Sequence, residues 1–189
     1  YWEHVYQDHD GTSVVSNMLN DGDILRRNLG DDAFEQKYGS LTGATLSDTL
    51  YRDAKPLWQE ANLVRQLSVD NEIAVPVNAV VHVLVTSNDV IHGWAVPSFG
   101  SRVQAVPGRT TATWFKAREI GIYYGQCAVL CGLKHSGMPI AVRVVEQDVF
   151  DKWMAAVKED KLDEARKILT ASAAKPGSSK KVASAPAAR

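Results

Sequence analysis

The feature that most restricts the fold of this chain is a series of short β-branched and aromatic runs after Asn62, closely punctuated by Gly and Pro. The clearest runs are IAVPV (73–77), AVVHVLVTS (79–87) and PIAVRVV (139–145). The segment LVRQLSV (63–69) alternates apolar and polar residues, as a half-buried strand does. Short strands separated this densely by turn residues are typical of a β-sandwich or barrel. We therefore predict a mainly β domain.

The segments on either side of these runs have different patterns. Apolar residues recur at helical spacing through residues 149–171, which predicts one C-terminal helix. Residues 172–189 have the composition of a disordered or partner-bound tail. Residues 1–18 form an aromatic segment with a candidate first strand, and residues 63–148 hold the predicted β core.

The remaining segment, residues 19–62, is rich in Asp, Gly, Leu and Arg and has no steady period. Within it, Asp31 to Tyr38 and Leu46 to Trp58 are each compatible with a short helix or a loop, and Ser47 is a candidate N-cap for the second helix. We expect a partly helical insertion.

Length and charge narrow the class of protein. A chain of 189 residues suits one domain with tails, and the formal net charge of -1 provides no basic field for coating nucleic acid. No run approaches 18 consecutive apolar residues, the length needed to cross a membrane. Residues 1–35 contain eight acidic residues and two basic ones. This imbalance indicates either solvated loops or an acidic face that attracts a basic partner.

The strongest chemical signal is a cluster of soft ligands within twelve residues, namely Cys127, Cys131, His135 and Met138. Two thiols, an imidazole and a thioether suit copper better than zinc, which seldom recruits Met, or an iron–sulfur cluster, which needs more cysteines. Buried free cysteines and a local disulfide are the alternatives. A mononuclear blue-copper site needs only one cysteine. Two cysteines four residues apart can instead bridge two copper ions through both sulfurs.

Such a site needs a second histidine. We favour His92, because it follows the strongest predicted strand beside Gly93, where loops carry functional groups. His82 lies inside that strand, which indicates a core or sheet-face histidine. His4 and His9 lie in the acidic N-terminal segment, and we expect both to face water.

Several segments together resemble the soluble domain of cytochrome c oxidase subunit II, in the family's order and spacing. They are VDNEIAVPVN, TSNDVIHGWAVPSFG, VQAVPGR and GIYYGQCAVLCGLKHSGMPIAV. The opening YWEHVYQD resembles the end of that family's aromatic stretch. The resemblance implies a cupredoxin-like Greek-key β-sandwich with a binuclear copper centre, CuA. This centre accepts electrons from cytochrome c and passes them to haem in subunit I of the oxygen-reducing, proton-translocating complex.

The resemblance also assigns the copper ligands. Cys127 and Cys131 would be the bridging thiolates. The other ligands would fall into two pairs, one for each copper: His92 with Met138, and His135 with the main-chain carbonyl of Val129.

Four further residues take roles from the family. Trp94 and Gln126 would lie directly behind the ligands, and Asp70 and Asp89 would lie on the face that docks cytochrome c. Val129 replaces a glutamate whose carboxylate also holds magnesium at the subunit I boundary, so this second metal is in doubt. No general base or nucleophile constellation is present, so we expect no catalytic residue.

The missing transmembrane helices lead to an expectation about partners. The chain begins inside the family's aromatic stretch, so we expect a separate polypeptide to carry the helices. We also expect further accessory subunits to contact the added segments. The site would face the mitochondrial intermembrane space at the inner membrane, or the bacterial periplasm. The alternatives are a CuA domain of another copper enzyme and a copper-binding assembly protein.

Overall fold

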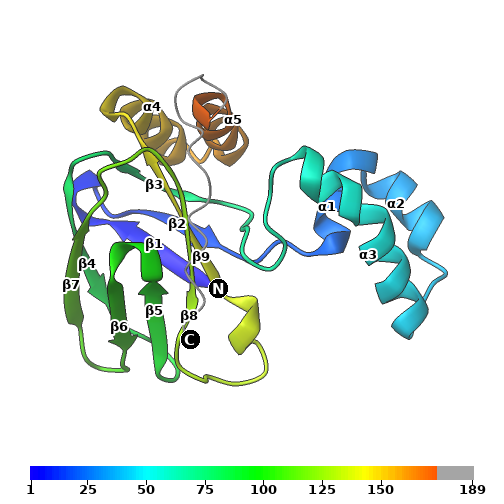
Figure 1. Ribbon diagram of the computed structural model, residues 1–189, viewed down its shortest axis with the longest axis horizontal. Coiled ribbons are helices and arrows are strands. Elements are labelled where there is room, and N and C mark those ends of the chain that lie inside the picture. The colour runs from blue at the N-terminus through cyan, green and yellow to red at the C-terminus, as the bar shows by residue number, and fades with distance from the viewer. Residues whose placement is uncertain (174–189) are drawn as a thin grey trace, which may run out of the picture.

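The computed structural model describes residues 1–173, which form three parts (Figure 1). The strands build a β-sandwich, two helices lie together along one end of it, and three more helices form a separate cluster to one side. The paired helices are α4 (Gln147–Lys158) and α5 (Leu162–Ala173), and the cluster contains α1 (Asp21–Leu29), α2 (Asp31–Tyr38) and α3 (Gly43–Glu60). In the described part of the chain, no helix has both the length and the apolar character to cross a membrane.

The sandwich is built from three sets of paired strands. The strands are β1 (Trp2–Tyr6), β2 (Thr12–Ser16), β3 (Ile73–Pro76), β4 (Val80–Val85), β5 (His92–Val96), β6 (Ser101–Ala105), β7 (Thr111–Lys116), β8 (Gly121–Cys127) and β9 (Pro139–Val145). A five-stranded sheet has the order β3-β9-β8-β5-β6, in which only β3 and β9 are parallel. The pairs β1–β2 and β4–β7 are antiparallel. The predicted mainly β sandwich is confirmed.

The core of the sandwich lies against β9, the most apolar strand. Ile140, Val142 and Val144 are completely buried, and Trp153 of α4 packs into the same core. On β6 the side chains alternate between buried and exposed positions, which is the pattern of a strand with one face in the core. The rigid centre of the domain is thus formed by strands that end at the predicted metal site.

The helical cluster has a core of its own, which includes Phe34, Tyr38 and Trp58. Both segments that were compatible with a helix or a loop are helical: the first spans Asp31 to Tyr38, and the second extends beyond Leu46 to Trp58, from Gly43 to Glu60. Ser47 is not its N-cap, because it lies inside α3, where its hydroxyl donates to the Gly43 carbonyl.

The sequence did not predict α1. Its N-terminus is closed by a reciprocal capping box, in which Asn20 and Asp23 each accept a hydrogen bond from the other's main-chain N–H. Asp21, in the first turn, accepts hydrogen bonds from Trp58 of α3 and from Arg65. These contacts tie α1 to the rest of the cluster.

Two predicted elements are wrong in detail. Residues 63–69 do not form a strand: they make local turns, and only Val69 has a β-bridge, to Met18. Leu63 packs on the helical cluster, while Val69 is buried and lies opposite Met18.

The predicted single helix at 149–171 is two helices. The break falls at Asp160, whose φ of 57° is left-handed and ends α4. The residues next to Asp160 are polar and exposed, so the chain can reverse direction there. Both helices then bury their apolar faces. Of the tail predicted for 172–189, only residues 172–173 are described, at the end of α5, and the rest lies outside the described residues.

Candidate metal centre

The predicted ligands come together because four segments end at the same edge of the sandwich. His92 is the first residue of β5 and Cys127 is the last residue of β8, and these strands are antiparallel neighbours. Met138 directly precedes β9, and His135 begins a short 3-10 turn in the loop between β8 and β9. The sheet therefore holds two of the ligands at strand ends and presents the others on one loop.

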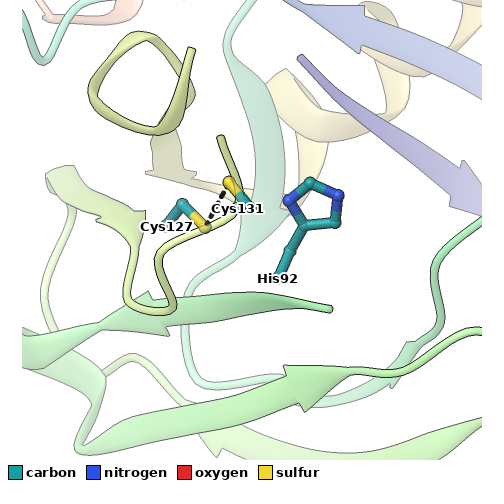
Figure 2. A group of neighbouring side chains, drawn as sticks. All are labelled: His92, Cys127 and Cys131. Atoms are coloured by element: carbon teal, nitrogen blue, oxygen red, sulfur yellow. Dashed lines mark hydrogen bonds between the residues drawn. The ribbon is translucent and has the colours of Figure 1, made fainter. Parts of the chain in front are cut away.

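The side chains form a compact set of donor atoms. The sulfurs of Cys127 and Cys131 are 3.7 Å apart, and both thiols are free (Figure 2). One ligand atom each from His92, Cys127 and Cys131 lie within 4.8 Å of one another. Figure 2 shows the His92 ring beside the two sulfurs.

The remaining predicted ligands join this group through the cysteines. The Cys131 sulfur lies 3.6 Å from His135 Nδ1 and 3.6 Å from the Met138 sulfur. The Val129 carbonyl oxygen lies 3.3 Å from the Cys127 sulfur. All six predicted ligand groups are therefore at one place. Desolvation and the adjacent Cys127 sulfur raise the pKa of Cys131.

The orientation of His92 is set by Asp89. His92 Nε2 lies 2.7 Å from the Asp89 carboxylate, which also accepts a hydrogen bond from the Ser87 hydroxyl. The hydrogen bond to His92 holds the pKa of Asp89 well below its usual range, so the carboxylate is ionised and can only accept. Nε2 must then carry the proton. His92 Nδ1 is buried with no hydrogen-bond partner in the described chain, so this nitrogen is the one available to a metal ion.

Trp2, on the first strand, braces the ligand loop from the other side. Its indole Nε1–H donates to the Met138 carbonyl at 3.1 Å, and the same carbonyl accepts from the Cys127 main-chain N–H at 3.3 Å. The Trp2 ring also meets the His92 ring edge-on, with centroids 6.1 Å apart. Sequence analysis missed this role, because nothing local to Trp2 indicates a contact 136 residues away.

Gly93 allows the two ligand-bearing segments to approach each other. A Cβ at this position would lie 3.0 Å from Val129 Cγ2 and 3.2 Å from Ala128, closer than side chains normally pack. The Gly93 N–H points to the Cys127 sulfur at 3.5 Å, and its carbonyl accepts from the Ala128 N–H at 2.9 Å. A side chain at Gly93 would therefore push the cysteine loop away from His92.

The two residues predicted to lie behind the ligands, Trp94 and Gln126, differ from each other in burial. Trp94 is buried opposite Cys127 in the strand register, and its ring stacks on Phe115. Gln126 precedes Cys127 but is exposed. Asp70 is not brought to the cluster: its carboxylate accepts hydrogen bonds from the main chain of Asn17 and Asn71.

The histidines set aside earlier have distinct environments. His82 lies on the exposed face of β4, in agreement with a sheet-face position. His9 is partly buried and packs edge-on against Phe150. The expectation that His4 faces water is wrong, because both ring nitrogens are buried and burial lowers the pKa of His4 to about 4. It lies on β1, on the same strand face as Trp2 and Tyr6.

A β-sandwich with a Cys–His–Met cluster at one end defines a cupredoxin-like domain. Comparison with known proteins gives the particular family. The model of the family described as "Cytochrome C oxidase subunit II, periplasmic domain" matches residues 46–145 of this chain. The chain belongs to this family, and the cupredoxin-like fold class is confirmed.

Individual relatives agree. The chain is 38% identical over 156 residues to the probable cytochrome c oxidase subunit 2 of Rickettsia conorii, covering 82% of this chain and 38% of that protein. It is 49% identical over 88 residues to cytochrome c oxidase subunit 2 of Cereibacter sphaeroides, covering 47% of this chain and 29% of the relative. The chain thus spans well under half the length of these relatives.

Two solved structures are similar in fold. One is the periplasmic domain of cytochrome oxidase subunit II (CoxB) of Bradyrhizobium japonicum, with a TM-score of 0.61, 37% identity, and coverage of 85% of this chain and 87% of that one. The other is a mixed-disulfide intermediate between thioredoxin-like TlpA and CoxB, with a TM-score of 0.55, 36% identity, and coverage of 85% and 84%. An alignment over 85% of the chain must include part of residues 19–62, because the rest of the chain is too short to supply it. At least part of the helical segment is therefore shared with these two structures.

Proposed function

We propose that this domain is the electron-entry site of a haem-copper respiratory oxidase and holds a binuclear CuA centre. Cys127 and Cys131 would bridge the two copper ions. The terminal ligands would be His92 with Met138 on one ion, and His135 with the Val129 carbonyl on the other. The observation that carries the proposal is the convergence of these six donor groups, including the unpartnered Nδ1 of His92.

The chemistry of the donors supports copper. Thiolate, thioether and imidazole are soft or borderline ligands, which is the set that copper prefers. When bound, copper would supply one-electron redox chemistry. Neighbouring residues of the chain hold the ligands in place. Asp89 orients His92, and Trp2 fixes the Met138 main chain. Val129 offers only its main-chain oxygen, so we propose no magnesium ion at this position.

Within the complex, electrons would arrive from cytochrome c and leave to haem in subunit I. The relatives and solved structures named above are all bacterial, which favours the periplasmic over the mitochondrial placement. Docking of cytochrome c through Asp70 and Asp89 stays a prediction. Both carboxylates accept hydrogen bonds within the chain, which leaves their negative charge in place to attract a basic partner together with the acidic residues of the N-terminal segment.

The cysteine pair must be reduced before copper can bind. The sulfurs lie 3.7 Å apart, so a modest movement would allow a disulfide, and the periplasm permits disulfides. The CoxB relative forms a mixed disulfide with a thioredoxin-like protein. We propose that a thioredoxin-like reductant likewise keeps Cys127 and Cys131 as thiols in this chain.

Reconstitution with copper tests the proposal. We expect two copper ions per chain and a seven-line hyperfine pattern in the electron paramagnetic resonance spectrum, because one unpaired electron is shared by two equivalent nuclei. A single copper with a four-line pattern would exclude the binuclear centre. Binding of one Cu(I) without visible absorption bands would instead support a copper-binding assembly protein.

A further inference from the structure

A cavity of about 230 Å³ lies where the helical cluster, strand β2 and helices α4 and α5 meet. It is separate from the metal centre, and none of the proposed copper ligands lines it. Its apolar wall is contributed by Leu19, Leu63, Val69, Trp153, Val157 and Leu169. A pocket with apolar walls and a few polar groups is the usual form of a site for a small organic ligand.

The most informative polar group in the cavity is Arg27. Its neighbour Arg26 forms ion pairs with Asp31 and Glu35. Arg27, by contrast, has no side-chain hydrogen bond or ion pair within residues 1–173, although it lines the cavity. Partial desolvation lowers the pKa of Arg27, although its side chain is exposed overall, and the like charge of Arg166 lowers it further. A guanidinium stays charged in proteins, and the carboxylates of Asp70, Asp23 and Asp163 act on it only through space, without a direct ion pair.

The other charged groups that line the cavity have direct partners within the described chain. Arg166 is paired with Asp163 and donates to the Asp70 main-chain carbonyl. The Asp70 carboxylate accepts hydrogen bonds from Asn17 and Asn71, and Glu72 forms a two-pronged ion pair with Arg143. Asp23, which does not line the cavity, acts at the N-terminus of α1 and influences Arg27 only through space, as Asp70 and Asp163 do. Arg27 is therefore the one cation lining the cavity without a direct ion pair among the described residues.

A second polar group in the cavity also lacks a partner. Asn71 lines the cavity, and its Oδ1 is buried with no hydrogen bond in the described chain. Its Nδ2 donates to the Val15 carbonyl at 3.0 Å, which fixes the amide orientation. A buried acceptor without a donor costs free energy unless a water or a ligand supplies the hydrogen.

From these contacts we propose that the cavity binds a small organic anion with an apolar body, of the class of a medium-chain carboxylate. The anionic group pairs with Arg27, and the alkyl body covers the apolar wall beside Trp153 and Leu169. Water or a hydroxyl on the ligand donates to Asn71 Oδ1. Because the wall includes residues of both cores, the bound anion joins the helical cluster to the sandwich and stabilises both.

Calorimetric titration of the metal-free full chain with sodium octanoate tests this site independently of copper. We expect saturable binding of one octanoate per chain and a rise in the melting temperature. The Arg27→Gln variant should bind at least about tenfold more weakly, since it loses a charge-assisted hydrogen bond. Arg118→Gln is the matched control, because Arg118 is also exposed and without an ion pair in the described chain but does not line the cavity.

The neutral analogue octan-1-ol separates the ionic contribution from the apolar one. We expect it to bind more weakly than octanoate to the wild type, and equally to the wild type and Arg27→Gln. Non-saturable uptake of octanoate overturns the proposal, as does equal octanoate affinity in the wild type and Arg27→Gln. Circular dichroism of Arg27→Gln is the check that the variant is folded, so that a loss of binding reports on the site.

Discussion

The metal end of the sandwich and the helical cluster are stabilised in different ways. At the metal end, residues from β1, β5, β8 and the β8–β9 loop meet, and their positions depend on strand register. The helical cluster packs Phe34, Tyr38 and Trp58 around a core made only of residues from 19 to 63. The first region is held by the whole sandwich, and the second by its own small core. Damage to one should therefore leave much of the other intact.

The largest expected effect is the loss of the metal site in Cys127→Ser. No other residue of the described chain supplies a second thiol beside Cys131, so copper binding should be abolished. The replacement is nearly isosteric, and we expect the apo-protein to stay folded, with the helical cluster unchanged. Copper content and the visible spectrum measure the site, while far-ultraviolet circular dichroism measures the fold. Ser136→Ala, an exposed position in the same loop, is the control and should retain both copper ions.

The reverse test is Trp58→Ala. Trp58 is buried in the helical core and its indole donates to Asp21, so truncation leaves a cavity and removes one hydrogen bond from a carboxylate that still pairs with Arg65. We expect the helical cluster to lose about 3–5 kcal/mol of stability. Amide hydrogen exchange should accelerate in α1–α3, while copper stoichiometry stays the same.

A matched control for this change is Trp114→Ala. Trp114 is 63% exposed on β7, and its truncation should change stability by about 0.5 kcal/mol or less. If Trp58→Ala also removes copper, the metal end and the helical cluster are not stabilised independently of each other.

The sequence was more informative about the metal end of the sandwich than about the helical cluster. The convergence of the candidate ligands could be inferred because four of them lie within twelve residues in an unusual combination of types. The helix α1 was not, because its sequence DGDILRRNL is short and its stability comes from the capping box and from contacts with Trp58 and Arg65. The interpretation of residues 63–69 as a strand failed because an alternating pattern does not reveal that the segment makes local turns and pairs with another segment only at Val69. The burial of His4 has no sequence signal either, since it depends on how β1 packs.

A smaller effect is expected at the support for the metal end. Trp2→Phe removes the hydrogen bond to the Met138 carbonyl but keeps an aromatic ring. That carbonyl still accepts from the Cys127 N–H, so the cost should be about 0.5–1.5 kcal/mol. We expect both copper ions to stay bound, with a shifted reduction potential and altered hyperfine couplings, because the Met138 and His92 positions relax.

Tyr6→Phe gives the comparison for that variant. It removes the Tyr6 hydroxyl, which donates to the Ala74 carbonyl and accepts from the Ala74 N–H, away from the ligands. It should cost at least as much stability and leave the potential unchanged. Equal potentials in the wild type and Trp2→Phe would show that Trp2 supports the fold and not the ligand geometry.

The smallest effect concerns pH and the helical cluster. The hydrogen bond from Arg65, supported by one from Trp58, lowers the pKa of Asp21 below its usual value. A carboxyl whose pKa is lower in the folded state stabilises that state above its unfolded pKa of about 3.9, and this stabilisation is lost as pH falls through the folded value. The wild type should therefore be more stable than Asp21→Asn at pH 7, and the difference should shrink below about pH 4. Urea unfolding followed by exchange in α1–α3 measures it. A difference that is constant between pH 7 and pH 3 would mean that the ionised carboxylate is not what ties Arg65 and Trp58 to α1, and that the cluster is held by its apolar core alone.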